Sequence, residues 1–173
     1  MGSGGMVVLD QDTFMVDMAR YFLAFTQAES CGKCMPCRLG TKQMLDILND
    51  ICAGKGSLED MALLEDISAA VQNGSLCGLG QTAPNPVRST LRYFKDEYES
   101  HVIHHKCRAG VCKPLFHYEI DPELCNGCGR CAKNCAVGAI SGEKKEPHYI
   151  NLTDCTKCGI CYQSCKYQAI AIH

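Results

Sequence analysis

The stretch "IDPELCNGCGRCAKNCAVGAI", residues 120–140, decides how the second half of this chain folds, because "INLTDCTKCGICYQSCKYQAI" repeats it at residues 150–170. Each copy contains four cysteines with the spacing C-x2-C-x2-C-x3-C. These cysteines are Cys125, Cys128, Cys131 and Cys135 in the first copy, and Cys155, Cys158, Cys161 and Cys165 in the second. The repeat predicts two copies of one structural unit, each with sulfur ligands in a tight loop.

The doubled spacing is typical of bacterial two-cluster ferredoxins, in which thiolates hold [4Fe–4S] clusters. Three cysteines in a tight loop can bind three irons, whereas the fourth points away along the following helix. The resemblance to this family implies that Cys165 completes the first site and Cys135 the second. Gly127, Gly129 and Gly159 would let backbone amides approach the sulfurs. We therefore expect a ferredoxin-like βαββαβ domain with two clusters over residues 119–173.

A pair of zinc knuckles is the alternative interpretation of this half. Zinc prefers two separated pairs of ligands, so two runs of four cysteines in a shared register favour clusters. The sequence also departs from the ferredoxin pattern, because Ala136 and Lys166 stand where the family has proline after the fourth cysteine. Proline fixes φ and lacks an N–H, so its loss changes the local backbone without removing a ligand.

Composition excludes several classes of protein. Fifteen cysteines in 173 residues is an odd number, which fits disulfide pairing poorly. The sequence shows no apolar leader and no run of about 20 apolar residues, so we expect a reduced, cytoplasmic, metal-loaded protein without membrane insertion. The net charge of −2, without a basic block, predicts no nucleic-acid partner. Residues 119–173 carry six acidic and six basic side chains, a balance that favours a module within a larger assembly.

Apolar periodicity predicts four helices in the first half. They are expected over residues 12–28, from Pro36 to Gly54, from the capping-box sequence at 57–60 to 73–74, and from 85–86 through Tyr98. The first helix places aromatic and methionine residues on one face, which we interpret as core: Phe14, Met18, Tyr21, Phe22 and Phe25. Four helices with short connections indicate an antiparallel four-helix bundle, assigned to residues 1–103.

A second cysteine motif interrupts this bundle. "ESCGKCMPCRLG", residues 29–40, places Cys31, Cys34 and Cys37 before the second helix. In an up-down-up-down bundle the loop between helices one and two lies at the same end as the loop between helices three and four. The latter contains "SLCGLG", residues 75–80, with Cys77. The topology therefore predicts a third [4Fe–4S] cluster held by Cys31, Cys34, Cys37 and Cys77.

The segments "MVDMARYFLAFTQAESCGKCMPCRLG" (15–40) and "SLCGLGQTAPNPVRSTLRYF" (75–94) resemble the C-terminal cluster domain of the NADH-oxidising flavoprotein subunit of respiratory complex I. A bundle fused to a two-cluster ferredoxin is similar to the β subunit of multimeric, electron-bifurcating or NAD(P)-linked [FeFe]-hydrogenases. The resemblance implies a C-terminal piece of a longer subunit. FMN and NAD(P) would then bind in a missing upstream domain, and the first residues would form a strand or linker from it.

These features predict an electron relay with no catalytic residue of its own. No Ser-His-Asp set, general-base pair or phosphate cradle is evident in the sequence. The resemblance implies electron flow between an upstream flavin and external ferredoxin or hydrogenase partners, namely the catalytic subunit and a small iron–sulfur subunit. The alternatives are a fragment of a complex I-type NADH dehydrogenase or formate dehydrogenase flavoprotein subunit, and a zinc-only interaction module. The fused ferredoxin tail argues against the complex I fragment.

Three cysteines remain outside the twelve cluster ligands: Cys52, Cys107 and Cys112. Cys52 ends the second predicted helix, and the fourth helix ends at the same pole with His101. Three thiolates and one imidazole form a closed tetrahedral zinc site. His101 is preferred because it lies on the helix and resembles the histidine of the hydrogenase β subunits, and His104 and His105 are alternatives. The competing interpretation is three unrelated thiols and a solvated histidine run. Zinc here would anchor a predicted linker, residues 104–118.

Overall fold

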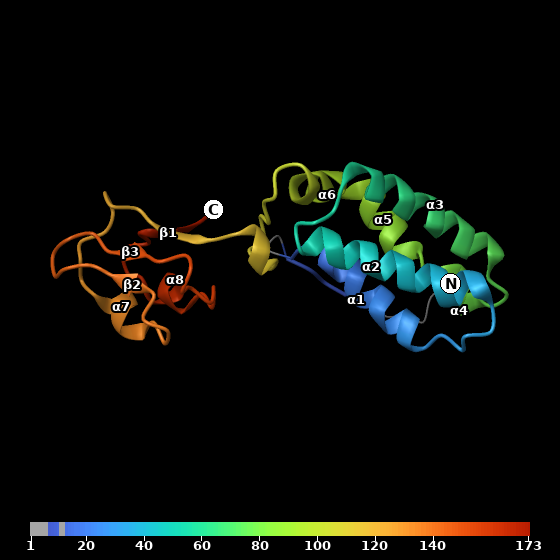
Figure 1. Cartoon of the computed structure of the whole chain (residues 1–173), viewed down its shortest axis with the longest axis horizontal. Coiled ribbons are helices and arrows are strands. Elements are labelled where there is room, and N and C mark those ends of the chain that lie inside the picture. Colours follow the sequence, from blue (N-terminus) through green and yellow to red (C-terminus); the bar gives the residue numbers. More distant parts are fainter. Residues whose placement is uncertain (1–6, 11–12) are drawn as a thin grey trace. The chain divides into compact units, whose positions relative to one another are not determined.

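A computed structural model of the chain describes residues 7–10 and 13–173, which form two compact units, Met1–Leu115 and Phe116–His173 (Figure 1). We call them the helical unit and the ferredoxin unit. The division between Leu115 and Phe116 falls within the predicted linker, residues 104–118. Of the predicted strand or linker at the beginning of the chain, residues 1–6 lie outside the described residues, and residues 7–10 have no regular secondary structure.

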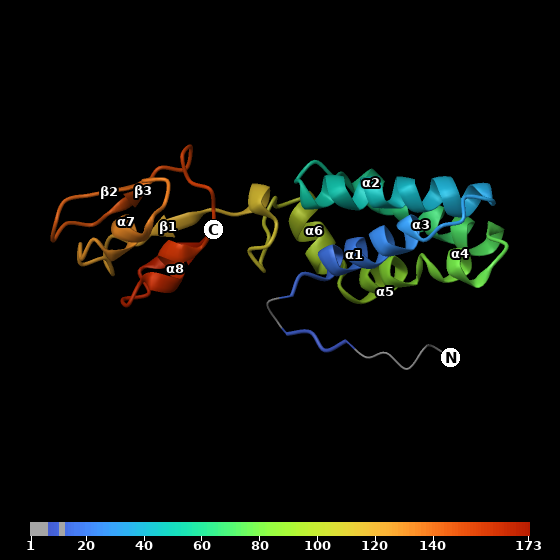
Figure 2. The ribbon, with the colours of Figure 1, turned by 90° about the horizontal axis from the view of Figure 1, so that it is seen from below.

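The helical unit is a set of α-helices packed side by side (Figure 2). Helix α1 packs against α2 and α5, and α2 also packs against α3. The core between them is made of fully buried side chains, among them Leu23, Met44, Leu48, Leu64 and Tyr98. The elements are α1 (Met15–Ala28), the π-helical turn η1 (Pro36–Gly40), α2 (Thr41–Cys52), α3 (Leu58–Gly74), α4 (Gly78–Thr82), α5 (Asn85–Tyr93), α6 (Lys95–Val102) and the 3-10 turn η2 (Lys113–Leu115).

Helix α3 begins and ends where the sequence predicts. Ser57 is its N-cap, with extended backbone, and its Oγ accepts a hydrogen bond from the Asp60 N–H at 3.2 Å. The Asp60 carboxylate accepts in return from the Ser57 N–H at 2.8 Å, which completes a capping box. The helix stops at Gly74. Local capping chemistry therefore fixes the residue at which this helix begins.

The fourth predicted helix is two helices. The helix is interrupted at Phe94, whose φ of −131° and ψ of 38° separate α5 from α6. Across this break the hydroxyl groups of Thr90 and Tyr98 lie 2.8 Å apart in the core. A buried phenol needs a hydrogen-bond partner. The break between the helices orients α6 so that the Tyr98 hydroxyl reaches Thr90 on α5.

The expected aromatic core face of α1 is wrong. The buried residues of this helix are Val16, Ala19 and Leu23, whereas Tyr21, Phe22 and Phe25 are exposed. Both sets recur at helical spacing, so periodicity alone does not decide between them. The smaller set allows α1 to approach α2 and α5 closely, and close packing selects that face. Phe14, just before the helix, is buried as expected.

The ferredoxin unit follows the predicted strand and helix order. It runs β1 (Tyr118–Ile120), α7 (Arg130–Asn134), β2 (Ile140–Ser141), β3 (Tyr149–Ile150), α8 (Ile160–Ser164) and β4 (Ile170–Ile172). Strand β1 pairs antiparallel with β4, with Tyr118 opposite Ile172, and β2 pairs antiparallel with β3, with Ile140 opposite Ile150. The strands thus form two small sheets. None of the helices in the described part of the chain is long and apolar enough to cross a membrane.

Candidate iron–sulfur and metal centres

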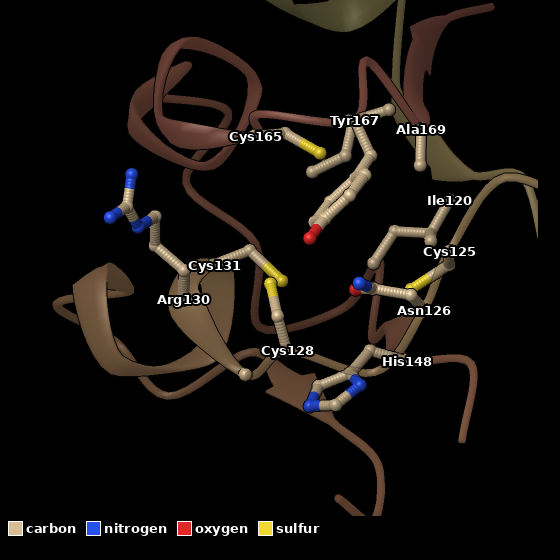
Figure 3. Close-up of a pocket in the computed structure, with 12 residues that line it drawn as sticks. Ile120, Cys125, Asn126, Cys128, Arg130, Cys131, His148, Cys165, Tyr167 and Ala169 are labelled. Atoms are coloured by element: carbon tan, nitrogen blue, oxygen red, sulfur yellow. The ribbon is translucent and has the colours of Figure 1, made fainter. Parts of the chain in front are cut away.

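A pocket in the ferredoxin unit gathers four of the predicted ligands. It is lined by three cysteines of the first run and by the last cysteine of the second run: Cys125, Cys128, Cys131 and Cys165 (Figure 3). Cys131 is buried, and this burial raises the pKa of its thiol. Figure 3 shows the Tyr167 ring extending between Cys165 and Asn126, while the Arg130 guanidinium points away from the pocket.

A second pocket in the same unit has the reciprocal composition. It is lined by three cysteines of the second run and by the last cysteine of the first: Cys155, Cys158, Cys161 and Cys135. The exchange of fourth cysteines follows from the helices. Each starts at a left-handed glycine, Gly129 or Gly159, and each ends at a cysteine with ψ of 108° that leaves the helix in extended conformation. The structure therefore places the fourth cysteine of each run beside the other run.

The close approach of the chain around the first pocket requires glycine. Gly127 has φ of +68°, and a Cβ at this position would lie 2.4 Å from the backbone nitrogen of Glu146. A side chain would therefore displace the first cysteine loop. The corresponding position in the second loop is Lys157, also with positive φ, and its N–H donates to Cys155 Sγ at 3.4 Å. This hydrogen bond is the kind of backbone contact that stabilises a thiolate ligand.

The chain segment around Cys77 lies next to the loop that carries the three cysteines before α2. A backbone N–H of Leu76 donates to Cys34 and lowers the pKa of its thiol. Cys77 is the N-cap residue of α4, directly after Leu76. The structure thus brings the loop that carries Cys77 to the Cys31–Cys37 loop, as the bundle topology predicts. Within this group Cys37 is buried, whereas Cys31 and Cys77 are exposed.

The turn that carries Cys37 is a π-helix, Pro36–Gly40, which contains one residue more than an α-helical turn would. The Thr41 hydroxyl donates to the Cys37 carbonyl at 2.6 Å and ties the turn to α2. Gly40 packs on α3, since a Cβ there would lie 2.3 Å from Val71 Cγ2. On the other side of the turn, Ser30 Oγ lies 3.3 Å from Cys37 Sγ.

Two buried side-chain polar atoms of the described residues have no hydrogen-bond partner, and each lies at a candidate site. The first is Ser75 Oγ, two residues before Cys77; the second is His101 Nε2. Buried polar groups are ordinarily paired, and an orphan indicates a missing partner such as an ion. Both observations fit sites that bind a metal group.

His101 joins two cysteines in a buried group. Its ligating atoms and those of Cys107 and Cys112 all lie within 4.8 Å of one another. His101 Nδ1 lies 2.9 Å from the Glu97 carbonyl, and because only nitrogen can donate in this pair, the neutral ring has its lone pair on Nε2. The Phe14 ring stacks on the imidazole with centroids 4.0 Å apart. The ring is therefore held in the tautomer whose Nε2 lone pair is available to a metal.

Cys52, the last residue of α2, reaches the same group through Cys112. The Cys112 side chain lies within hydrogen-bonding range of both Cys52 and Cys107, and this contact lowers the pKa of each of the two thiols. The Cys112 N–H also donates to Cys107 Sγ at 3.4 Å. His104 and His105, the alternative ligands, are exposed. The structure thus brings His101, Cys107 and Cys112 together, and Cys52 lies beside Cys112.

Sequence reasoning missed the side chains that surround the ligands. Ser30 and Ser75 were not singled out, although both stand close to cluster cysteines in the sequence. Tyr118 and His148 are buried residues that line the second and the first ferredoxin pocket. They occupy corresponding positions in the two repeats, and that correspondence was the available signal.

Fold and sites together define an iron–sulfur electron-transfer protein with two kinds of cluster domain. Residues 17–101 match the NADH-ubiquinone oxidoreductase-F iron-sulfur binding region, and residues 119–140 and 148–171 each match a 4Fe-4S binding domain. The chain is 52% identical over 170 residues to the NADP-reducing hydrogenase subunit HndC of Solidesulfovibrio fructosivorans, which covers 98% of this chain and 35% of that protein. It corresponds to the C-terminal part of a subunit of this kind.

Two further relatives match a little more than half of this chain. The F subunit of the NADH-quinone oxidoreductase of Streptomyces coelicolor is 39% identical over 107 residues, 62% of this chain and 24% of that protein. The crystal structure of an NAD+-reducing [NiFe]-hydrogenase in the H2-reduced state matches 55% of this chain and 17% of that chain, with 34% identity and a TM-score of 0.53. The chain therefore spans about a third or less of the length of the relatives it matches.

Proposed function

We propose that this chain relays electrons through three [4Fe–4S] clusters within a larger NAD(P)-linked hydrogenase-type complex. The observation that carries the proposal is the exchange of fourth cysteines in the ferredoxin unit, where each pocket has three ligands from one run and one from the other. That arrangement suits two cubes with four thiolates each. The third cluster is assigned to Cys31, Cys34, Cys37 and Cys77, at one end of an antiparallel bundle whose fourth member is α5 and α6 together.

When bound, each cluster supplies a one-electron carrier. The chain's own residues hold the thiolates in place, limit the access of water and donate hydrogen bonds to sulfur. The Leu76 N–H to Cys34 and the Lys157 N–H to Cys155 are two such donors. Donors of this kind favour the more negative, reduced state of a cluster, and burial opposes it. Differences between these surroundings would set the order in which electrons occupy the three clusters.

The larger complex would supply the chemistry that this part of the subunit does not. FMN and NAD(P) would bind in an upstream domain, and the partners would be a hydrogenase catalytic subunit, a small iron–sulfur subunit and an external ferredoxin. The names of the relatives support a multisubunit assembly, since they describe subunits of a hydrogenase and of NADH-quinone oxidoreductases. Electron bifurcation and a cytoplasmic location belong to the same proposal.

A specific observation favours a second, structural function for the group at His101. Its Nε2 is buried without a partner and lies with the buried thiols of Cys107 and Cys112, and the Cys52 thiol contacts that of Cys112. Three thiolates and one imidazole are a closed zinc set, and such sites contribute folding energy. Zinc at Cys52, His101, Cys107 and Cys112 would join the end of α2, helix α6 and the 107–112 loop.

Metal analysis of anaerobically prepared protein tests both proposals. We expect about twelve irons per chain, from three four-iron sites, together with one zinc. EPR of the reduced protein should show three interacting or separate cluster signals. Iron that saturates at two clusters contradicts the site in the helical unit. Colourless protein with zinc alone would instead support an interaction module.

A further inference from the structure

We propose that the Ser75 hydroxyl donates a hydrogen bond to a sulfur atom of the cluster in the helical unit and raises the reduction potential of that cluster. The inference rests on the proposed cluster at Cys31, Cys34, Cys37 and Cys77. In this proposal, Ser75 influences the reduction potential of the cluster although it is not one of the ligands.

The main chain of Ser75 is fully engaged, which leaves its hydroxyl as the group without a role. Ser75 follows α3 with φ of −80° and ψ of 140°. Its N–H donates to the Val71 carbonyl at 3.2 Å, and its carbonyl accepts from Gln81 Nε2 at 3.0 Å. The residue is 4% exposed, and Oγ has no hydrogen-bond partner. The backbone is therefore fixed while a buried donor remains unpaired.

The hydroxyl lies among the loops that carry the cluster ligands. A Cβ on Gly80 would be 2.5 Å from Ser75 Oγ and 3.2 Å from Cys37 Cβ, so both groups approach the same point. The next residue, Leu76, donates its N–H to Cys34, and Cys77 follows. Ser75 thus directly precedes one residue whose backbone contacts a proposed ligand and another that is itself a proposed ligand.

A cluster sulfur is the acceptor that this environment lacks. Leaving a buried hydroxyl unpaired costs free energy, and a water molecule there would need two or more polar partners of its own. The sulfur atoms of a thiolate-bound cluster carry negative charge and accept hydrogen bonds. The unpaired donor and the cluster therefore satisfy each other.

The hydrogen bond has a predictable direction of effect. Reduction adds one electron to the cluster and makes its sulfurs better acceptors, so a donor stabilises the reduced state more than the oxidised state. Removing the hydroxyl should lower the ratio of reduced to oxidised cluster by about tenfold at a fixed potential. For a one-electron couple, that ratio corresponds to a downward shift of about 59 mV.

The test is an EPR-monitored redox titration of the whole anaerobic chain, with dithionite as the reductant and soluble mediators. Ser75→Ala should shift one cluster to lower potential and leave the two ferredoxin clusters unchanged, and Ser75→Thr, which keeps a hydroxyl, should stay near the parent value. Ser68→Ala is the matched control, because this buried hydroxyl already donates to the Leu64 carbonyl at 2.6 Å. It should move no potential.

The outcomes separate this inference from the function on which it rests. If the parent protein binds two clusters only, the proposed site in the helical unit is wrong. If three clusters are present and Ser75→Ala leaves all potentials unchanged, the hydrogen bond is wrong while the site stands. Should Ser75→Ala lose the cluster, retention in Ser75→Thr at the parent potential supports the hydroxyl, and loss in both variants overturns it.

Discussion

The two ends of helix α2 carry candidate sites of opposite character. The π-helical turn that leads into α2 carries Cys37 in a loop whose neighbours Cys31 and Cys77 are exposed. At the other end, Cys52 meets a group in which His101, Cys107 and Cys112 are all buried. A twelve-residue helix is about 18 Å long, so both sites belong to one packed core. We infer that the more exposed site exchanges electrons, whereas the buried site stabilises the fold.

Among the described residues, the two buried side-chain polar atoms without a hydrogen-bond partner differ between the two ends of α2 in the same way. Ser75 Oγ is a donor in need of an acceptor, which suits an electron-rich cluster, whereas His101 Nε2 offers a lone pair, which suits a cation. Each end of the helix thus presents the complement of the group proposed there. Substitutions at one end should leave the other intact, and the following predictions test that independence.

The largest effect is expected from Cys107→Ser. Losing a ligand should reduce zinc affinity by more than the roughly 10- to 100-fold typical of losing a supporting residue. It should also lower the thermal unfolding midpoint of the helical unit, because zinc binding contributes folding energy. Competition with a chelator and circular dichroism measure the two quantities. The visible cluster spectrum should persist, and zinc retained at parental affinity would refute the site.

Next in size is Cys77→Ser, which acts at the opposite end. We expect iron to fall from about twelve to about eight per chain, as one of three four-iron sites is lost, while zinc stays at one. Iron and zinc analysis of the same sample gives both numbers. A loss of zinc alongside the iron would show that the two ends are not independent.

A moderate effect is expected from Phe14→Leu. The Phe14 ring stacks on His101, with planes 9° apart, and we expect this contact to hold the imidazole in the orientation that the proposed zinc site needs. Loss of the aromatic ring should weaken zinc binding by about tenfold, which is at the lower end of the range for residues that support a metal ligand. The reduction potentials of the clusters should not change. Phe25→Leu is the matched control, because Phe25 is an exposed aromatic residue of α1. Equal zinc affinities in the two variants would exclude the stacking role.

The smallest effect is expected from Ser57→Ala, which removes the N-cap of α3. The helical unit should lose about 1 kcal/mol of unfolding free energy, without loss of iron or zinc. Chemical denaturation measures the change, and Ser57→Asn should restore most of it because asparagine also caps helices. A change in metal content would mean that α3's first turn supports a site directly.

Much of the ferredoxin unit could be predicted, because a repeated motif constrains both copies at once. The strand and helix order follows from the repeat, and the exchange of Cys135 and Cys165 follows from the family pattern. In the helical unit, the Ser57 capping box was a sufficient local signal for the start of α3. What failed depended on contacts distant in sequence. Two apolar faces of α1 competed, and only packing against α2 and α5 selects Leu23 over Phe25.

The break at Phe94 and the unpaired Ser75 could not be foreseen for the same reason. Neither residue carries a local signal for its role; Phe94 stands in an unbroken helical pattern, and Ser75 in a loop. The first depends on the meeting of Thr90 and Tyr98, and the second on how the 75–80 segment packs beside Cys37. The cysteine spacing was enough to predict the ligands, whereas the residues around the ligands could be recognised only from the three-dimensional structure.

The π-helical turn makes this part of the chain sensitive to length. Each residue of a helix advances about 100° around its axis, so deleting one residue between Cys37 and Thr41 would restore a regular helix but rotate Cys37 by that angle relative to Met44 and Leu48. Such a deletion would therefore move Cys37 away from the other proposed ligands without replacing any ligand or any core side chain. A change in the length of this turn would therefore perturb the site even where every ligand is kept.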